Sequence, residues 1–166
     1  LMNPRPHLVL FGGGHVGLAV ARLCDLLDYR YTVVDDRADY ANRERFPAAV
    51  ETVVGHAADF FRGRDLAPYS HVYVLGYSHH EDESTLAAAL QSFSGAIGLI
   101  GSRSKRTDLQ ARLIAQGISA GDFDRKVQCP IGLDIHAETP AEIAVAILGE
   151  VIRHHRMTTA ASVGGS

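Results

Sequence analysis

Three glycines, Gly12, Gly14 and Gly17, have the spacing G-x-G-x-x-G and directly follow the hydrophobic run 8–11. Because glycine has no side chain, backbone N–H groups at the start of a following helix can approach an anion closely. A helical pattern follows over residues 18–29, so the loop lies between a strand and a helix, as a dinucleotide-binding loop requires. The loop therefore predicts a site for a nucleotide or for another cofactor that carries phosphate.

His15 and Val16 lie inside this loop, where the helix begins. The positive end of the helix dipole disfavours protonation of a histidine there. We therefore expect His15 to be a neutral donor or acceptor beside the bound group. A solvent-facing histidine without such a role is the equal alternative.

Two carboxylates, Asp35 and Asp36, end the second apolar run, about 20 residues beyond the glycines. At this spacing a carboxylate reaches a ribose hydroxyl, so we expect at least one of them to bind ribose. The alternative is that one of them caps the following turn. Carboxylates oppose a 2′-phosphate, although Arg37 could partly offset them.

A basic segment follows the fifth apolar run and contains Gly101, Ser102, Arg103, Lys105 and Arg106. The serine is placed to cap the next helix, and the three cations suit a phosphate or pyrophosphate. A solvated helix face is the alternative. We favour anion binding because the segment follows a strand.

Histidines and carboxylates also gather in residues 77–83. Adjacent histidines can ligate zinc, but the sequence contains no C-x-x-C or H-x-x-x-H that would complete a tetrahedral set, so we predict no metal site. The acids 81–83 equally suit the first turn of a helix. His79 or His80 remains a candidate for contacting a ligand.

Cys129 lies in a turn with proline and glycine at residues 129–134. Its thiol could serve as a ligand or handle sulfur, and a buried inert thiol is the alternative. The sequence contains no Ser-His-Asp order, P-loop lysine or redox C-x-x-C, so no catalytic residue is predicted.

The elements that must position these residues are five apolar runs, 7–11, 31–34, 49–53, 71–75 and 96–100, which alternate with helical patterns. Continuous apolar runs are typical of parallel strands covered on both faces. The sequence therefore predicts an α/β fold, a Rossmann-like doubly wound parallel sheet with three αβα layers. Ligands bind such sheets beyond the carboxyl ends of the strands. A capping box at Thr139 and Glu142 predicts the start of the last helix.

The chain of 166 residues suits one domain over 1–157, and the small polar residues 158–166 are expected to be disordered. The net charge of −3 gives no general attraction to nucleic acid or to an anionic membrane, and no apolar run is long enough to span a bilayer. Two cysteines cannot define a disulfide scaffold, so a cytoplasmic protein is expected. A homodimer is the default oligomer.

Four segments can be taken together: 11–17 (FGGGHVG), 33–37 (VVDDR), 97–106 (IGLIGSRSKR), and 129–135 (CPIGLDI) with 138–140 (ETP). They resemble the Rossmann domain of the XdhC/CoxI family. The members of this family are accessory proteins of molybdenum hydroxylases such as xanthine dehydrogenase. The resemblance extends over residues 7–152.

The resemblance implies a chaperone that holds molybdenum cofactor, a molybdopterin with a phosphate that in some forms extends to a dinucleotide. Such a protein assists sulfuration of the cofactor by a sulfurating enzyme and delivers it to the apo-hydroxylase. The family motif T-x-D-H is matched only by His80, with Glu83 three residues on, and the family's N-terminal domain is absent from this sequence. The opening Leu1-Met2 also suggests a fragment.

Two other functions share the glycine loop. One is an NAD(P)-dependent oxidoreductase, which would need a substrate domain that this sequence has no residues left to form. The other is a regulatory nucleotide-binding domain, for which Cys129 and the basic segment would have no role.

Overall fold

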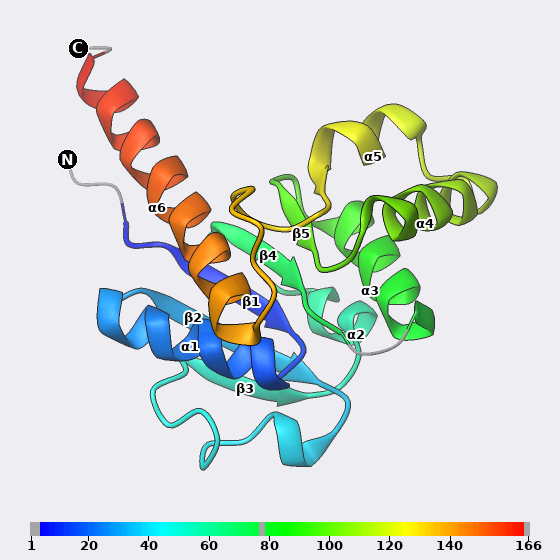
Figure 1. Cartoon of the computed structure of the whole chain (residues 1–166). Coiled ribbons are helices and arrows are strands. Elements are labelled where there is room, and N and C mark those ends of the chain that lie inside the picture. Colours follow the sequence, from blue (N-terminus) through cyan, green and yellow to red (C-terminus); the bar gives the residue numbers. More distant parts are fainter. Residues whose placement is uncertain (1–3, 77–78, 165–166) are drawn as a thin grey trace.

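A six-stranded parallel sheet forms the centre of the molecule (Figure 1). The computed structural model describes residues 4–76 and 79–164, with the backbone alone for residues 79, 80 and 160–164. The strand order is β3-β2-β1-β4-β5-β6, which confirms the predicted doubly wound Rossmann fold. The strands are β1 His7–Phe11, β2 Arg30–Asp35, β3 Glu51–Val54, β4 His71–Val74, β5 Ile97–Leu99 and β6 Val127–Gln128.

Helices cover the sheet on both faces, so alternate residues of each strand enter different cores. In β1, Leu8 and Leu10 pack with α1 and α6, whereas Val9 and Phe11 pack with the helices of the opposite face. The covering helices are α1 His15–Leu27 and α6 Pro140–Gly164 on one face, and α2 Ala57–Phe61, α3 His79–Ser92, α4 Arg103–Ala115 and α5 Ala120–Lys126 on the other. Burial on both faces explains why the strands lack polar alternation.

The predicted capping signals are present at two helices. Thr139 Oγ1 accepts a hydrogen bond from the Glu142 N–H, and Glu142 Oε1 accepts one from the Thr139 N–H, so α6 begins with a capping box. At α4, Ser102 Oγ accepts a hydrogen bond from the Lys105 N–H at 3.1 Å. At α4 and α6, side chains near the helix start therefore help to determine where the helix begins.

The structure differs from the sequence-based expectation at several elements. The first helix begins at His15 instead of residue 18, because its amino end comes directly from the glycine loop. Helices α2 and α5 and strand β6 are too short for a periodic pattern to reveal them. Residues 158–164, expected to be disordered, continue α6, where the Thr158 and Thr159 hydroxyls donate to helix carbonyl oxygens one turn earlier.

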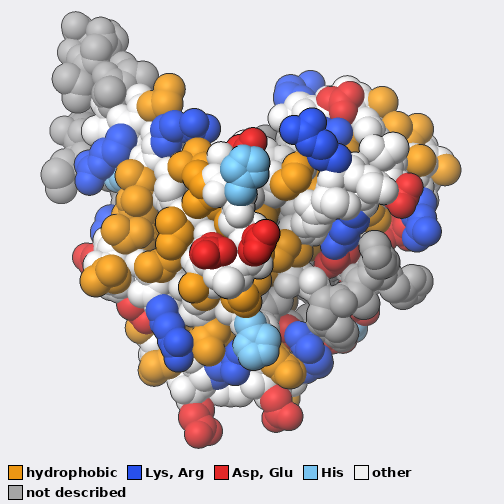
Figure 2. Space-filling model, in the orientation of Figure 1, with side chains coloured by type: hydrophobic (Ala, Val, Ile, Leu, Met, Phe, Trp, Pro, Cys, Tyr) orange, Lys and Arg blue, Asp and Glu red, His pale blue; other side chains and the backbone are white. Residues whose placement is uncertain are grey.

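No helix within the described ranges is both long and apolar enough to cross a membrane. On the face drawn in Figure 2, acidic and basic side chains are interspersed among hydrophobic ones. This distribution agrees with the small net charge of −3.

Candidate functional site

The glycine loop connects β1 to α1 at the carboxyl edge of the sheet, where the strand order reverses between β1 and β4. Gly12 has a φ of +123°, and a Cβ there would lie 2.8 Å from the Leu75 carbonyl oxygen. A Cβ at Gly17 would lie 2.3 Å from the Gly12 carbonyl oxygen. The first and third glycines are therefore required by close backbone approach, as in dinucleotide-binding loops.

The amino end of α1 is open. Gly14 is its N-cap and supplies no side-chain hydrogen bond, and the first turn contains no acidic residue. A Cβ built on Gly14 meets no atom within 4 Å, and the neighbouring His15 is exposed. The structure thus places Gly14, His15, Val16 and Gly17 at the N-cap and in the first turn of α1, whose N–H groups are suited to an anion.

Asp35, at the tip of β2, is bound within the protein. Its Oδ2 accepts hydrogen bonds from the Gly13 N–H and from Arg37 Nη2, and its Oδ1 accepts from Arg37 Nε and the Arg37 N–H, all at 2.9–3.0 Å. Burial alone would raise the pKa of Asp35, but the bonds from Arg37 and Gly13 outweigh it, and the pKa is lowered. Because a carboxylate offers about four acceptor positions, a ribose hydroxyl would have to displace one of these donors.

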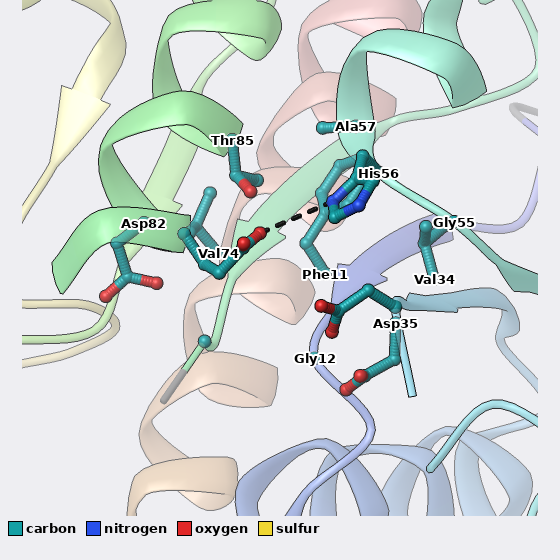
Figure 3. A pocket seen from close by; sticks show the side chains of 13 residues that line it. Phe11, Gly12, Val34, Asp35, Gly55, His56, Ala57, Val74, Asp82 and Thr85 are labelled. Atoms are coloured by element: carbon teal, nitrogen blue, oxygen red, sulfur yellow. Dashed lines mark ion pairs between the residues drawn. The ribbon is translucent and has the colours of Figure 1, made fainter. Parts of the chain in front are cut away.

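Asp36 differs from its neighbour because its side chain is exposed. It lines a crevice over the ends of β1, β2 and β4. Gly12, His56 and Asp82, labelled in Figure 3, line the same crevice. The crevice has a volume of about 40 Å³, which suits a few water molecules or an ion but not a nucleotide. Of the two predicted ribose-binding carboxylates, Asp36 is therefore the accessible one.

Lys105 in the basic segment is held by an acid. Its Nζ lies 2.5 Å from Asp82 Oδ2 and also donates to the Ile100 carbonyl oxygen at 2.9 Å. The Asp82 side chain is only 2 % exposed, so this is a buried ion pair between α3 and α4. Gly101, with a φ of +148°, makes room for the lysine chain, since a Cβ there would lie 2.4 Å from Lys105 Cδ.

The other two cations of the segment have different environments. Arg106 packs over the Phe123 ring at 5.1 Å and lies 3.5 Å from an Asp124 carboxylate oxygen. Arg103 is exposed and lines a cavity of about 540 Å³ between the end of β5 and the start of α6. The structure thus places Arg103 at the cavity.

This cavity has apolar walls from Ile100, Ile131 and Ile143, with Asp134 and His136 among its polar groups. Its volume is in the range of small-molecule sites. Cys129 directly precedes Pro130, which lines the cavity. Its side chain is half-buried, and its Sγ lies 3.5 Å from the Gly101 carbonyl oxygen. Burial raises the pKa of the Cys129 thiol, and the positive charges of Lys105 and Arg106 partly oppose this.

The loop after β4 is described only in part. Residues 77 and 78 and the side chains of His79 and His80 lie outside the described residues, so the predicted contact of His80 with a ligand stays a prediction. From the sequence, Asp82 is expected only to add negative charge to the first turn of a helix. In the structure it is the buried ion-pair partner of Lys105. Sequence reasoning also missed His56, although this residue follows a strand end like the segments that were singled out.

Comparisons with known proteins agree with the geometry of the loop and sheet. The chain matches the family model described as the XdhC Rossmann domain over residues 8–151. The uncharacterized protein YqeB of Escherichia coli (strain K12) is 32% identical over 152 residues, which are 90% of this chain and 27% of YqeB. A probable xanthine dehydrogenase subunit of Bacillus subtilis (strain 168) is 26% identical over 152 residues, which are 92% of this chain and 44% of that protein.

A crystal structure of a xanthine dehydrogenase from Bacillus halodurans is also similar. It has a TM-score of 0.79 and 27% sequence identity, and the match covers 96% of this chain and 45% of that chain. The chain therefore spans less than half the length of each of these relatives.

Proposed function

Because the chain belongs to the XdhC Rossmann domain family, we propose that it is the cofactor-binding part of an accessory protein for a molybdenum hydroxylase of the xanthine dehydrogenase type. In this role it holds molybdenum cofactor as cargo during maturation of the hydroxylase. An apo-hydroxylase and a sulfurating enzyme are the partners that the role requires.

The observation that carries the proposal is the open amino end of α1. Its orphan N–H groups and the positive end of its dipole favour a phosphate, and no atom lies within 4 Å of the position that a Cβ of Gly14 would take. Asp35 holds the loop in place through the Gly13 N–H. Molybdopterin has a phosphate that could lie there.

The cavity of about 540 Å³ would accommodate the pterin part of the same molecule. Only β4 lies between β1 and β5, so the two strand ends are about 10 Å apart. Arg103 offers a guanidinium to hydrogen-bond acceptors of a ligand in this cavity, and the Cys129 Sγ lies 3.5 Å from the carbonyl oxygen of Gly101, which lines the cavity.

NAD(P) is the competing ligand for a glycine loop of this kind. The four hydrogen bonds that Asp35 already accepts argue against its use for a ribose, which leaves Asp36 as the carboxylate for that contact. A cofactor without a ribose needs neither carboxylate.

We expect the purified protein to bind molybdopterin more tightly than NAD in parallel titrations followed by native mass spectrometry. Arg103→Ala should weaken molybdopterin binding about ten-fold, because a hydrogen bond to a charged group is lost. Arg22→Ala, which removes an exposed arginine of α1, is the matched control and should bind normally. Tight binding of NAD without any response to molybdopterin would refute the proposed function.

A further inference from the structure

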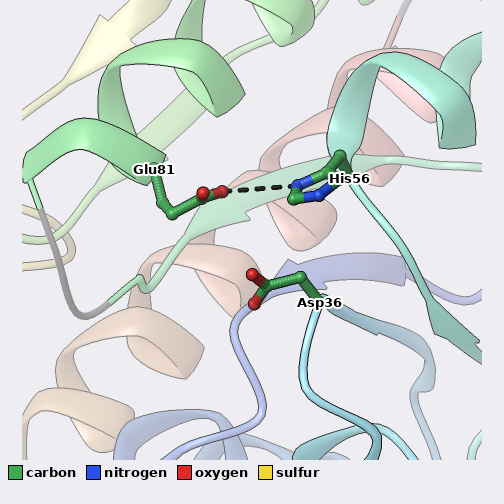
Figure 4. A group of neighbouring side chains, drawn as sticks. All are labelled: Asp36, His56 and Glu81. Carbon is green, nitrogen blue, oxygen red and sulfur yellow. Dashed lines mark ion pairs between the residues drawn. The ribbon is translucent and has the colours of Figure 1, made fainter.

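We propose that Asp36, His56 and Glu81 form a binding site for one divalent transition-metal ion of the Zn²⁺ or Mn²⁺ type. One ligand atom from each residue lies within 4.8 Å of the other two. Figure 4 shows the His56 imidazole and the two carboxylates directed toward a common space. One imidazole nitrogen and two carboxylate oxygens are a donor set that binds such ions.

The three residues come from separate segments that meet only in the folded chain. Asp36 follows β2, His56 precedes α2, and Glu81 lies in the first turn of α3. His56 Nδ1 and Glu81 Oε2 are 3.5 Å apart. Two ligands of a tetrahedral zinc ion, with bonds of about 2.0–2.1 Å, are separated by about 3.4 Å. The observed separation therefore needs little adjustment.

A simpler explanation covers only part of the cluster. An acid in the first turn of α3 stabilises the helix dipole, and an ion pair between Glu81 and His56 accounts for the approach of these two side chains but not for that of Asp36. His56 is the N-cap residue of α2, but its side chain makes no capping hydrogen bond. The approach of Asp36 to the same point adds a second negative charge, which a bound cation would offset.

The surroundings also suit an ion. The three residues line the crevice of about 40 Å³ described above, which has room for an ion and few waters. Two other acids of the crevice, Asp35 and Asp82, already face Arg37 and Lys105. Three protein ligands leave at least one coordination position for water or for an oxygen of a ligand at the adjacent Gly12.

The test is a calorimetric titration of the chelator-treated protein with Zn²⁺ and, separately, with Mn²⁺. We expect one ion per chain. Asp36→Asn, His56→Ala and Glu81→Gln should each weaken binding by at least about ten-fold, since even residues behind the ligands have effects of that size. Asp108→Asn and Glu44→Gln, which change exposed acids elsewhere, are matched controls and should bind like the wild-type protein.

Two further measurements exclude other ligands. The absorption spectrum of the Co²⁺ form should lack thiolate charge-transfer bands, because Cys129 is not in the cluster. A variant in which His79 and His80 are both alanine should retain the ion. Stoichiometric binding that survives all three cluster substitutions, or the absence of stoichiometric binding, would overturn the site. None of these experiments uses molybdopterin, so their outcome is independent of the proposed function.

Discussion

The Lys105 ammonium contacts the Asp82 carboxylate at 2.5 Å and the Ile100 carbonyl oxygen at 2.9 Å. Its side chain is 15 % exposed and that of Asp82 is 2 % exposed. A charge pair removed from water to this extent is costly to break, because the remaining charge keeps its desolvation penalty. At the scale of the single residue, Lys105 therefore supports the fold, whereas Arg103 in the same segment is exposed beside a cavity.

We predict that Lys105→Met lowers the free energy of unfolding by on the order of 3 kcal/mol, because the buried Asp82 carboxylate loses the cation that it faces. Urea denaturation measures this change. Arg103→Met is the matched control, and as a surface change it should alter stability by less than about 0.5 kcal/mol. Similar small effects of both substitutions would contradict the structural role of the ion pair.

At the scale of the element, α1 is joined to β1 by two glycines in close contact. A Cβ on Gly17 would lie only 2.3 Å from the Gly12 carbonyl oxygen, so the helix can approach the strand this closely only if residue 17 has no side chain. Gly14 is in open space at the helix end. The same motif thus contains one glycine needed for packing and another that leaves room for a ligand.

We expect Gly17→Ala to reduce stability by about 1–3 kcal/mol, because the methyl group must displace the helix from the strand. Gly14→Ala should cost less than about 1 kcal/mol, since its methyl group meets no atom and only the N-cap preference is lost. In the proposed function the same methyl group should weaken molybdopterin binding. Thermal unfolding and the cofactor titration, run on both variants, check these expectations, and an equal loss of stability would contradict them.

At the scale of the whole molecule, His7 and His71 are buried at the amino edge of the sheet. Burial is the main cause that lowers the pKa of His7 to about 4, with a further contribution from Arg30. Burial also lowers the pKa of His71 to about 4, assisted by the charges of His154 and His155. Both side chains therefore stay neutral in the folded protein at pH values where the unfolded chain is protonated.

The sign of the pH dependence follows from these two values. Between the unfolded pKa of about 6.5 and the folded pKa of about 4, the unfolded chain binds protons that the folded chain does not, so stability falls as the pH is lowered. At pH 5 we expect a loss of about 2 kcal/mol per histidine relative to pH 7. Denaturation at both pH values should show a smaller difference for His71→Gln, and an unchanged difference would contradict this origin.

Much of the architecture could be predicted from local patterns. The apolar runs predicted five of the six strands, and the capping box predicted the start of α6, because both features depend on residues close together in the chain. Strand β6, with two residues, has no pattern of its own and forms through its pairing with β5. The proximity of His56 to Asp36 and Glu81 could not be inferred, because these two residues are 20 and 25 positions away in the sequence.

The sequence by itself determined the type of fold, the glycine loop and the family, because each depends on residue types at short and regular spacing. Only the tertiary structure decided which charged side chains are accessible. Asp35 and Lys105 are bound by partners within the protein, whereas Asp36 and Arg103 face a crevice and a cavity. A charge's availability depends on which groups the folded chain places beside it, and its position in the sequence does not specify them.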